Sequence, residues 1–227
     1  MELKKWLVGF EEVGKAVLAV VLLSLLFFVW TSFFPSLLPL LSLSRSHPWG
    51  IFTALFTHAD TEHLLSNLLS FISFSFLFVL LHFPRRVEVR REMALAFTLS
   101  LFLAGLGVNL VDFLYRWSSG SSSTSCGSSG IVYAVMGMVF VSSFYNFLLF
   151  SRLSLKYPSL RFPLLLAASP AVAVLLVFGW ELLFHPSSFF SVAPSANVQA
   201  HVLGFIYGMV IFTFMLWERT SYRGFRS

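Results

Sequence analysis

Long apolar runs separated by short polar segments dominate this chain. Each run reaches the length of helix, about 20 residues, that crosses a hydrocarbon core of about 30 Å. The sequence shows neither an internal repeat nor a separate soluble domain. The pattern therefore predicts an all-α polytopic membrane protein, a bundle of six transmembrane helices. We place the helices at 13–34, 59–82, 93–115, 129–150, 161–184 and 198–217.

The first apolar run follows two lysines, Lys4 and Lys5, as the apolar region of a signal peptide would. Glu11 and Glu12 lie between these lysines and the run, and no small-x-small cleavage pattern follows Phe34. The run is also longer than the apolar region of a signal peptide, so it predicts a retained transmembrane helix.

Composition and charge agree with a membrane protein. Hydrophobic residues make up 57% of the 227 positions and charged residues 11%, which excludes a water-soluble domain. The single cysteine, Cys126, excludes an intramolecular disulfide. Of the 15 Lys and Arg, only Arg45 and Arg116 fall in the first and third loops, so both termini are expected in the cytoplasm. The net charge of +5 then belongs to cytoplasmic loops, and no nucleic-acid partner is expected.

The expected organisation is a cytoplasmic N-terminal segment (1–12), a six-helix domain (13–217) and a cytoplasmic tail (218–227). Within the domain, the first outer loop (35–57) is long and apolar, which predicts that it lies in the membrane interface. An ordinary loop with some apolar residues is the alternative. The apolar residues of this loop include Leu40, Leu41, Trp49, Phe52 and Phe56.

Three predicted helices open with polar residues that are costly inside a bilayer and therefore mark a functional site. The second opens with HADTEHLLSN (58–67), the fourth with GSSG (127–130) and the sixth with NVQAHVLGFIYG (197–208). By the expected topology, all three openings lie on the outer side of the membrane. We therefore expect their side chains to meet at one depth.

In the second helix, His63 and Asn67 are four residues apart and share one face. His58 lies five residues before His63, which is not the His-Glu-x-x-His spacing of a zinc protease. No second set of His and carboxylate residues completes a metal site, so neither a metal nor another cofactor is expected.

Small residues predict that the fourth and sixth helices pack closely. In the sixth helix, His201 shares a stripe with two glycines at helical spacing, and the fourth helix carries a matching small surface. Ser129 begins the fourth helix, and Tyr133 lies one turn further on. Close packing would bring the Ser129 hydroxyl and the His201 imidazole together. The small residues are Gly204 and Gly208 on the sixth helix and Gly130, Ala134 and Gly137 on the fourth.

The Ser/Gly-rich stretch before the fourth helix supplies what a serine nucleophile needs in a membrane. A loop inside the protein admits water, and the helix start presents unpaired N–H groups. Gly127 and Gly130 keep the approach to Ser129 free of side chains.

The chemistry that this pattern predicts is acyl transfer. His201 takes the proton of Ser129, which attacks a peptide carbonyl and forms an acyl-enzyme. The backbone N–H groups of Ser128 and Ser129, with the side chains of His63 and Asn67, are expected to stabilise the oxyanion.

The sequence predicts a Ser–His dyad and not a triad. Asp112 and Glu181 are the nearest carboxylates by loop position, and neither has a helical spacing that ties it to His201. Tyr133 is expected to restrain the imidazole by packing against it.

With these residues assembled, the chain resembles the rhomboid family of intramembrane serine proteases. The resemblance rests on His58-x4-His63-x3-Asn67, on the segment from Gly127 to Gly137 and on the segment from Ala200 to Gly208. It implies a six-helix rhomboid-like bundle that cleaves transmembrane segments of other membrane proteins near their outer ends.

The resemblance also implies roles for individual residues. It makes Ser129 the nucleophile, His201 the base and His58 a supporting residue, and it makes His63 and Asn67 oxyanion helpers. Two features depart from the family pattern: Gly50 follows Trp49 where relatives have Arg, and the second helix ends without the Gly and Glu of many relatives. The six-helix layout resembles the prokaryotic form, which implies a prokaryotic cell membrane as its location.

Three other functions are compatible with parts of the pattern. A transporter or channel would use the intramembrane polar residues as an ion path, but the chain lacks the repeated halves typical of transporters. A catalytically inactive rhomboid relative, acting as a membrane chaperone or adaptor, should have lost the serine or the histidine, and both are present. A dyad alone is also compatible with ester hydrolysis. The sequence specifies neither a particular substrate nor an oligomeric state.

Overall fold

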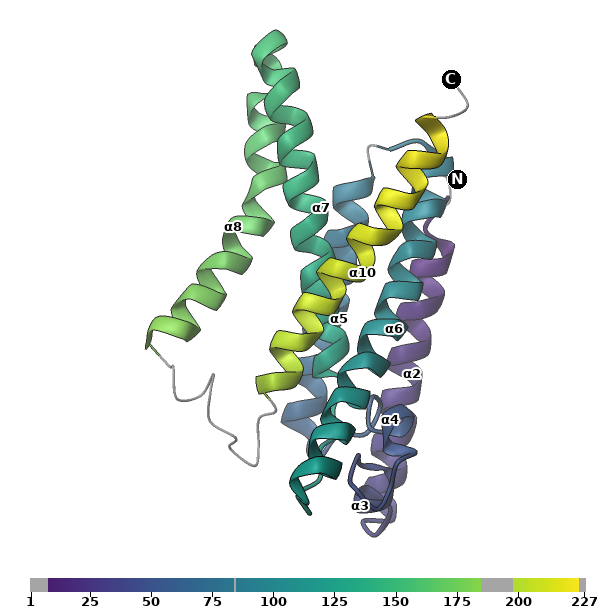
Figure 1. Cartoon of the computed structure of the whole chain (residues 1–227). Helices are drawn as coiled ribbons and strands as arrows, with labels where there is room; N and C mark the ends of the chain where they lie inside the picture. Colours follow the sequence, from purple (N-terminus) through teal and green to yellow (C-terminus); the bar gives the residue numbers. More distant parts are fainter. Residues whose placement is uncertain (1–7, 84, 185–197, 225–227) are drawn as a thin grey trace.

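The computed structural model describes residues 8–83, 85–184 and 198–224, which form helices joined by short connections (Figure 1). The chain is an all-α polytopic membrane protein, because α2, α5, α6 and α7 are each long and apolar enough to cross a bilayer. The described apolar parts of α8 and α10, Leu164–Leu176 and Ala200–Leu216, are shorter. The long helices are α2 (Glu11–Phe33), α5 (Thr61–His82), α6 (Val87–Ser119), α7 (Ser129–Lys156), α8 (Arg161–Phe184) and α10 (Val198–Gly224).

The six predicted helices agree with these six elements, and the differences lie at their ends. The α6 helix begins at Val87 and ends at Ser119, beyond the predicted range 93–115. Its first turns are charged, and hydropathy alone does not detect a helix that continues outside the apolar region. Gly120 ends α6 in the left-handed conformation (φ 69°), as glycine does at many helix C-termini.

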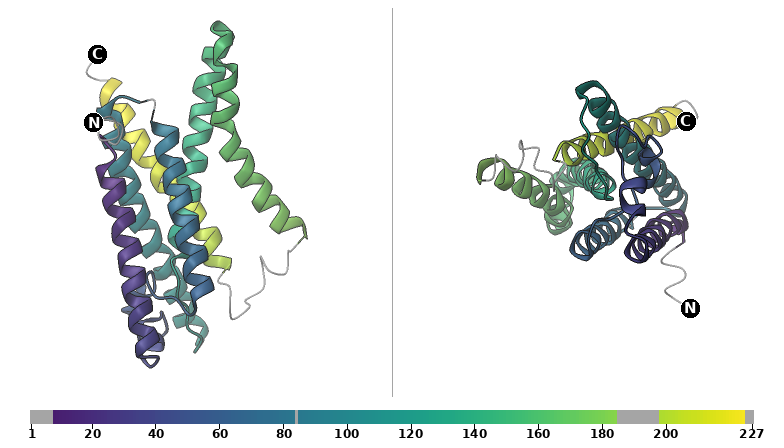
Figure 2. Two further views of the ribbon diagram at one scale, coloured as in Figure 1. Left: turned by 180° about the vertical axis from the view of Figure 1, so that it is seen from behind. Right: turned by 90° about the horizontal axis from the view of Figure 1, so that it is seen from below.

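The helices alternate in direction, so α5, α7 and α10 begin at the same end of the bundle, the lower end in Figure 1. We call this the site end, because all three polar helix openings lie there. At the opposite end, α2 begins and α10 ends (Figure 2, left). The arrangement agrees with the expectation that the three openings share one depth.

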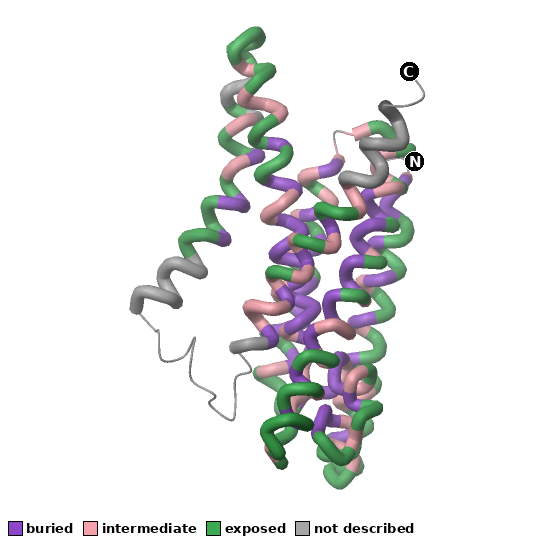
Figure 3. Tube along the Cα trace, viewed as in Figure 1, coloured by how far each residue is buried: buried purple, intermediate pink, exposed green. Residues whose placement is uncertain are grey.

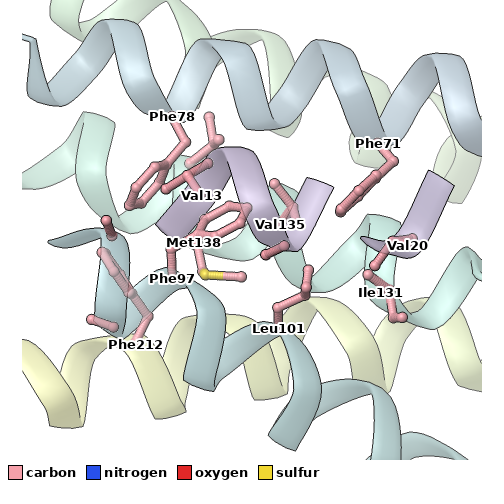
Figure 4. Packing of buried hydrophobic residues seen from close by; sticks show 14 of the residues in the cluster. Val13, Val20, Phe71, Phe78, Phe97, Leu101, Ile131, Val135, Met138 and Phe212 are labelled. Carbon is pink, nitrogen blue, oxygen red and sulfur yellow. The ribbon is translucent and has the colours of Figure 1, made fainter. Parts of the chain in front are cut away.

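The α7 helix lies at the centre, in contact with α5, α6, α8 and α10 (Figure 2, right). The apolar core forms where α2, α5, α6, α7 and α10 meet, and its large side chains are fully buried (Figure 4). The faces turned away from α7 are exposed and apolar, as expected of helices in contact with lipid (Figure 3). The core residues include Phe71, Phe78, Phe97, Met138 and Phe212.

Glycines bring the backbones of α7 and α10 into direct contact. A Cβ atom on Gly204 would lie 2.5 Å from the carbonyl oxygen of Gly130. A Cβ atom on Gly208 would overlap the carbonyl oxygen of Ala134. Gly137 on α7 meets the Phe205 carbonyl of α10 in the same way. The two helices therefore pack closely at these glycines.

Segment 35–57 between α2 and α5 folds around two short helices, α3 (Leu37–Leu41) and α4 (Gly50–Thr53). The indole Nε1 of Trp49 donates to the Leu40 carbonyl at 2.7 Å, and the ring is half exposed. Gly50 faces the backbone of Leu43, where a Cβ atom would lie 2.7 Å from the Leu43 nitrogen. This close approach leaves no room for a side chain at position 50, where the family pattern has Arg.

Pro170 lies inside α8 and has no N–H to donate to the carbonyl four residues earlier, and a side chain of α7 bonds the backbone of α8 on both sides of this proline. The hydroxyl of Ser143, fully buried, donates to the Ala167 carbonyl and accepts from the Ala171 N–H at 3.2 Å. One serine of α7 thus joins two backbone groups of α8 at the proline.

Candidate active site

The polar opening of α7 begins at Gly127, where the backbone conformation and the surroundings both favour glycine. Gly127 has φ 122°, a conformation that side chains rarely adopt. A Cβ atom there would also lie 2.6 Å from Cε1 and 2.7 Å from Nε2 of His63. Ser128 then caps α7, and Ser129 is its first residue, as predicted. The His63 ring therefore lies close to Gly127 and occupies the space that a side chain would need.

His58 holds Ser128 from the opposite side. Its Nδ1 lies 3.2 Å from the Phe56 carbonyl, which can only accept, so Nδ1 carries the proton. Its Nε2 then accepts from the Ser128 hydroxyl at 3.2 Å and from the Ser128 N–H at 3.4 Å. Burial, followed by the nearby His63, lowers the pKa of His58 to about 4. A neutral His58 thus fixes the residue just before Ser129.

Asn67 and His63 lie on α5 and face the same loop. The Asp60 carboxylate caps α5 by accepting from the His63 N–H at 2.7 Å, and the His63 ring meets that of His58 edge to face at 5.2 Å. Asn67 is 8% exposed, and its Nδ2 has no hydrogen-bond partner among the described residues. The same Nδ2 would lie 3.6 Å from a Cβ atom on Gly127. A buried, unpaired donor therefore points toward the loop beside Ser129.

His201 lies on α10, opposite the first turns of α7. Its ring stacks on Tyr133, with 4.3 Å between the ring centroids and 11° between the planes. Tyr133 is one turn from Ser129, and the neighbouring contact between Gly130 and Gly204 joins the two helices. Ser129 Oγ and His201 share no hydrogen bond within the described part of the chain. Catalytic hydrogen bonds are often long before substrate binds, so the arrangement remains compatible with a dyad.

Ser129 lines a small pocket with Asn109, Cys126, Gly127 and Ala200. The cavity volume of about 20 Å³ is enough for one water molecule. Asn109 donates to the Ile51 carbonyl at 2.9 Å and so ties α6 to α4. Sequence reasoning did not single out Asn109 or Cys126, because neither belongs to a recurring motif.

Neither carboxylate considered for His201 is placed beside it by the structure. Asp112 pairs with Arg116 and accepts from the Ser125 hydroxyl, and the side chain of Glu181 lies outside the described residues. The four-residue spacing of Asp112 and Arg116 on a helix is a signal from which this pair was predictable. Among the described residues, no group of three or more His, Cys, Asp and Glu could hold a metal ion.

Comparison with known protein families gives one match. Residues 45–218, from segment 35–57 through most of α10, match the Rhomboid domain. A comparison with curated proteins found no match.

Proposed function

Since the chain belongs to the rhomboid family, we propose that it is an intramembrane serine endopeptidase that cleaves transmembrane segments of other membrane proteins near their outer ends. The stack of His201 on Tyr133, one turn from Ser129, is the observation that carries the proposal. Among the described residues, the Ser128 hydroxyl is bonded to His58, so Ser129 is the serine at the start of α7 that we assign as the partner of this imidazole.

In the proposed mechanism, His201 removes the proton of Ser129 as the oxygen attacks the substrate carbonyl carbon. His201 then gives this proton to the leaving amine as the C–N bond breaks, which leaves an ester on Ser129. A water molecule attacks the ester with His201 again as the base, releases the carboxylic acid product and restores the serine. The small pocket beside Ser129 has room for this water.

The oxyanion requires donors that are free when the charge forms. We assign the largest share to the Ser129 N–H at the helix start and to Asn67 Nδ2, which has no partner in the described part of the protein. His63, in contact with Gly127, is the third donor. The N–H of Ser128 points to His58 at 3.4 Å, so Ser128 contributes mainly by holding the loop.

We place the site end on the outer side of a prokaryotic cell membrane, with both termini in the cytoplasm. The charge distribution supports this orientation, because Arg85 and Arg86 lie between α5 and α6, and Arg90 and Arg91 lie at the start of α6, away from the site end. The substrates are transmembrane helices that reach Ser129 from the bilayer. The alternative is an inactive relative that acts as a chaperone or adaptor, and such a relative is expected to lack the serine or the histidine, both of which this chain has.

The test is cleavage of a single-pass transmembrane substrate by the purified protein in detergent. We expect Ser129→Ala and His201→Ala each to abolish cleavage with thermal stability retained. Ser32→Ala, which removes an exposed serine of α2 whose hydroxyl donates to the Phe28 carbonyl of the same helix, should cleave normally. Mass spectrometry of the products would place the cut within the transmembrane segment.

A fluorophosphonate that reacts with activated serines separates the alternatives. Labelling of the unmodified protein that is lost in Ser129→Ala supports the nucleophile assignment, whatever the substrate. Absence of both labelling and cleavage on several substrates would favour the inactive relative. Cleavage of small esters but of no transmembrane peptide would favour an ester hydrolase.

A further inference from the structure

The loop that leads into α7, residues 120–128, is rich in serine and glycine, yet it is bonded on two sides. We call it the serine loop. Arg116 Nη1, on the last turn of α6, donates to the Ser123 carbonyl at 2.7 Å and to the Ser123 hydroxyl at 2.5 Å. The Ser125 hydroxyl donates to Asp112 Oδ2 at 2.7 Å. Two side chains of α6 thus hold two positions of the loop.

Asp112 and Arg116 also bond each other, with 3.0 Å between Oδ1 and Nε. The side chains of both are 9% exposed, so the pair is buried at the site end of α6. A buried ion pair is stable when further hydrogen bonds satisfy its remaining donors and acceptors, and the serine loop supplies them. The pair and the loop therefore form one network, in which removal of one charge leaves the other buried and unpaired.

The opposite side of the loop is held by segment 35–57. Ser125 and Leu43 exchange two backbone hydrogen bonds of 2.8 and 3.0 Å, and the Gly127 N–H donates to the Ala54 carbonyl at 2.9 Å. Ser125 is thus bonded through its backbone to Leu43 and through its side chain to Asp112. Its position fixes where the chain enters Gly127 and Ser129.

We propose that Asp112 and Arg116 are positioning residues for Ser129, which set the register of the serine loop and so aim the nucleophile and its oxyanion donors. This inference rests on the proposed function. The His63 ring leaves Gly127 little room to compensate for a shift of Ser125, because a Cβ atom on Gly127 would already lie 2.7 Å from His63 Nε2. A displacement of about 1 Å in a reacting group can lower a rate by about a hundredfold.

Cys126 provides a direct reporter of the loop. It is the single cysteine of the chain, it lies between Ser125 and Gly127, and it lines the pocket of Ser129. Burial raises the pKa of its thiol, so the held loop reacts slowly with a maleimide. Release of the loop exposes the thiol and brings its pKa back toward the ordinary value. Both changes accelerate labelling.

The experiment compares Arg116→Gln, Asp112→Asn and Ser125→Ala with the unmodified full chain in detergent. The control is Glu12→Gln, which removes a charge from the exposed pair between Glu12 and Lys15 on α2. The readouts are kcat and KM for a transmembrane substrate, the rate of N-ethylmaleimide labelling of Cys126, and thermal stability. Ser125→Ala keeps the ion pair and loses only the link to the loop, so it tests the proposal even where a charge variant fails to fold.

We expect kcat to fall about tenfold to a hundredfold in Arg116→Gln and Ser125→Ala, with KM little changed. Labelling of Cys126 should be severalfold faster, and Arg116→Lys, which can still reach Asp112, should lie between Arg116→Gln and the unmodified protein. An unchanged rate of Cys126 labelling would overturn the proposal. It would do so even if kcat fell, because a fall that only accompanies a loss of thermal stability reports on folding and not on the loop. If the unmodified protein cleaves nothing, the proposed function fails, and the labelling rate still decides whether the pair holds the loop.

Discussion

Tyr133 of α7 and His201 of α10 lie face to face, nearly parallel, at the point where the two helix backbones touch. The relationship supplies an orientation for the imidazole that does not depend on a carboxylate. In a Ser–His–Asp triad the carboxylate fixes the ring through a hydrogen bond, whereas here the flat face of a tyrosine restrains its tilt.

The stack predicts that the aromatic ring of Tyr133, and not its hydroxyl, orients the His201 imidazole. Tyr133→Phe keeps the stacked face, and we expect kcat within a few-fold of the unmodified protein. Tyr133→Ala loses a stack of about 0.5–1.5 kcal/mol and frees the imidazole, so kcat should fall about tenfold. Steady-state cleavage of a transmembrane substrate checks both variants. Equal rates for Phe and Ala would show that the stack has no part in orienting His201.

The contact between α7 and α10 predicts that Gly204→Ala is strongly harmful. The added methyl would lie 2.5 Å from the Gly130 carbonyl oxygen, so the helices must separate. Overpacking of this kind costs about 1–3 kcal/mol, and it also moves His201 away from Ser129. Gly14→Ala on α2 is the matched control, because a Cβ atom there meets nothing within 4 Å and alanine favours a helix. The unfolding temperature and the cleavage rate should both fall for Gly204→Ala. Both should stay unchanged or improve for Gly14→Ala.

The unpaired donor of Asn67 predicts a loss of activity without a loss of stability. Its Nδ2 has no partner among the described residues, so Asn67→Ala removes no hydrogen bond of that atom from the folded protein. Removal of one oxyanion donor lowers kcat by about a hundredfold to a thousandfold. Asn109→Ala is the contrast, since it breaks the bond to Ile51 and should lower the unfolding temperature. An unchanged kcat in Asn67→Ala would remove Asn67 from the site.

The sequence alone was sufficient for the helices, their directions and the contact between α7 and α10. Helix length in a bilayer depends on local hydropathy, and close packing depends on glycines at regular spacing, so both can be predicted without knowledge of the fold. The start of α7 at Ser129 followed from the same local signals. The roles proposed for Ser129 and His201 stay predictions until activity is measured.

The bonds of the loops could not be predicted, because they depend on how segments far apart in the chain meet. Ser128 binds His58, 70 residues away, and Ser125 pairs with Leu43. Asp112 was considered only as a partner of His201, yet it holds the serine loop. A run of serines gives no sequence signal that separates a bonded loop from a flexible one.

The low pKa of His58 predicts that acid destabilises the protein. Because burial lowers this pKa from 6.5 to about 4, the unfolded state binds the proton more tightly than the folded state. The contribution of neutral His58 to the free energy of unfolding is fully present above about pH 6.5 and is lost as the pH falls toward about 4. The full loss amounts to about 3 kcal/mol. Thermal unfolding in detergent between pH 4 and pH 8 measures it. His58→Gln should unfold at a lower temperature at neutral pH and should lose this part of the pH dependence; an unaltered pH profile would contradict the assignment.

The insertion of Ser143 at Pro170 predicts a difference between two adjacent buried serines of α7. Ser143→Ala removes both hydrogen bonds that join α7 to the Ala167 carbonyl and the Ala171 N–H of α8, and each such bond contributes about 0.5–1.5 kcal/mol. Ser142 donates only within its own helix, to the Met138 carbonyl, so Ser142→Ala is the matched control and should change stability little. Unfolding in a denaturing detergent measures the difference. Hydrogen exchange at the amide of Ala171 tests the cause, since this amide should exchange faster in Ser143→Ala than in Ser142→Ala. Equal stability and equal protection in the two variants would show that α8 is held at the proline by its packing on α7 and not by the hydroxyl.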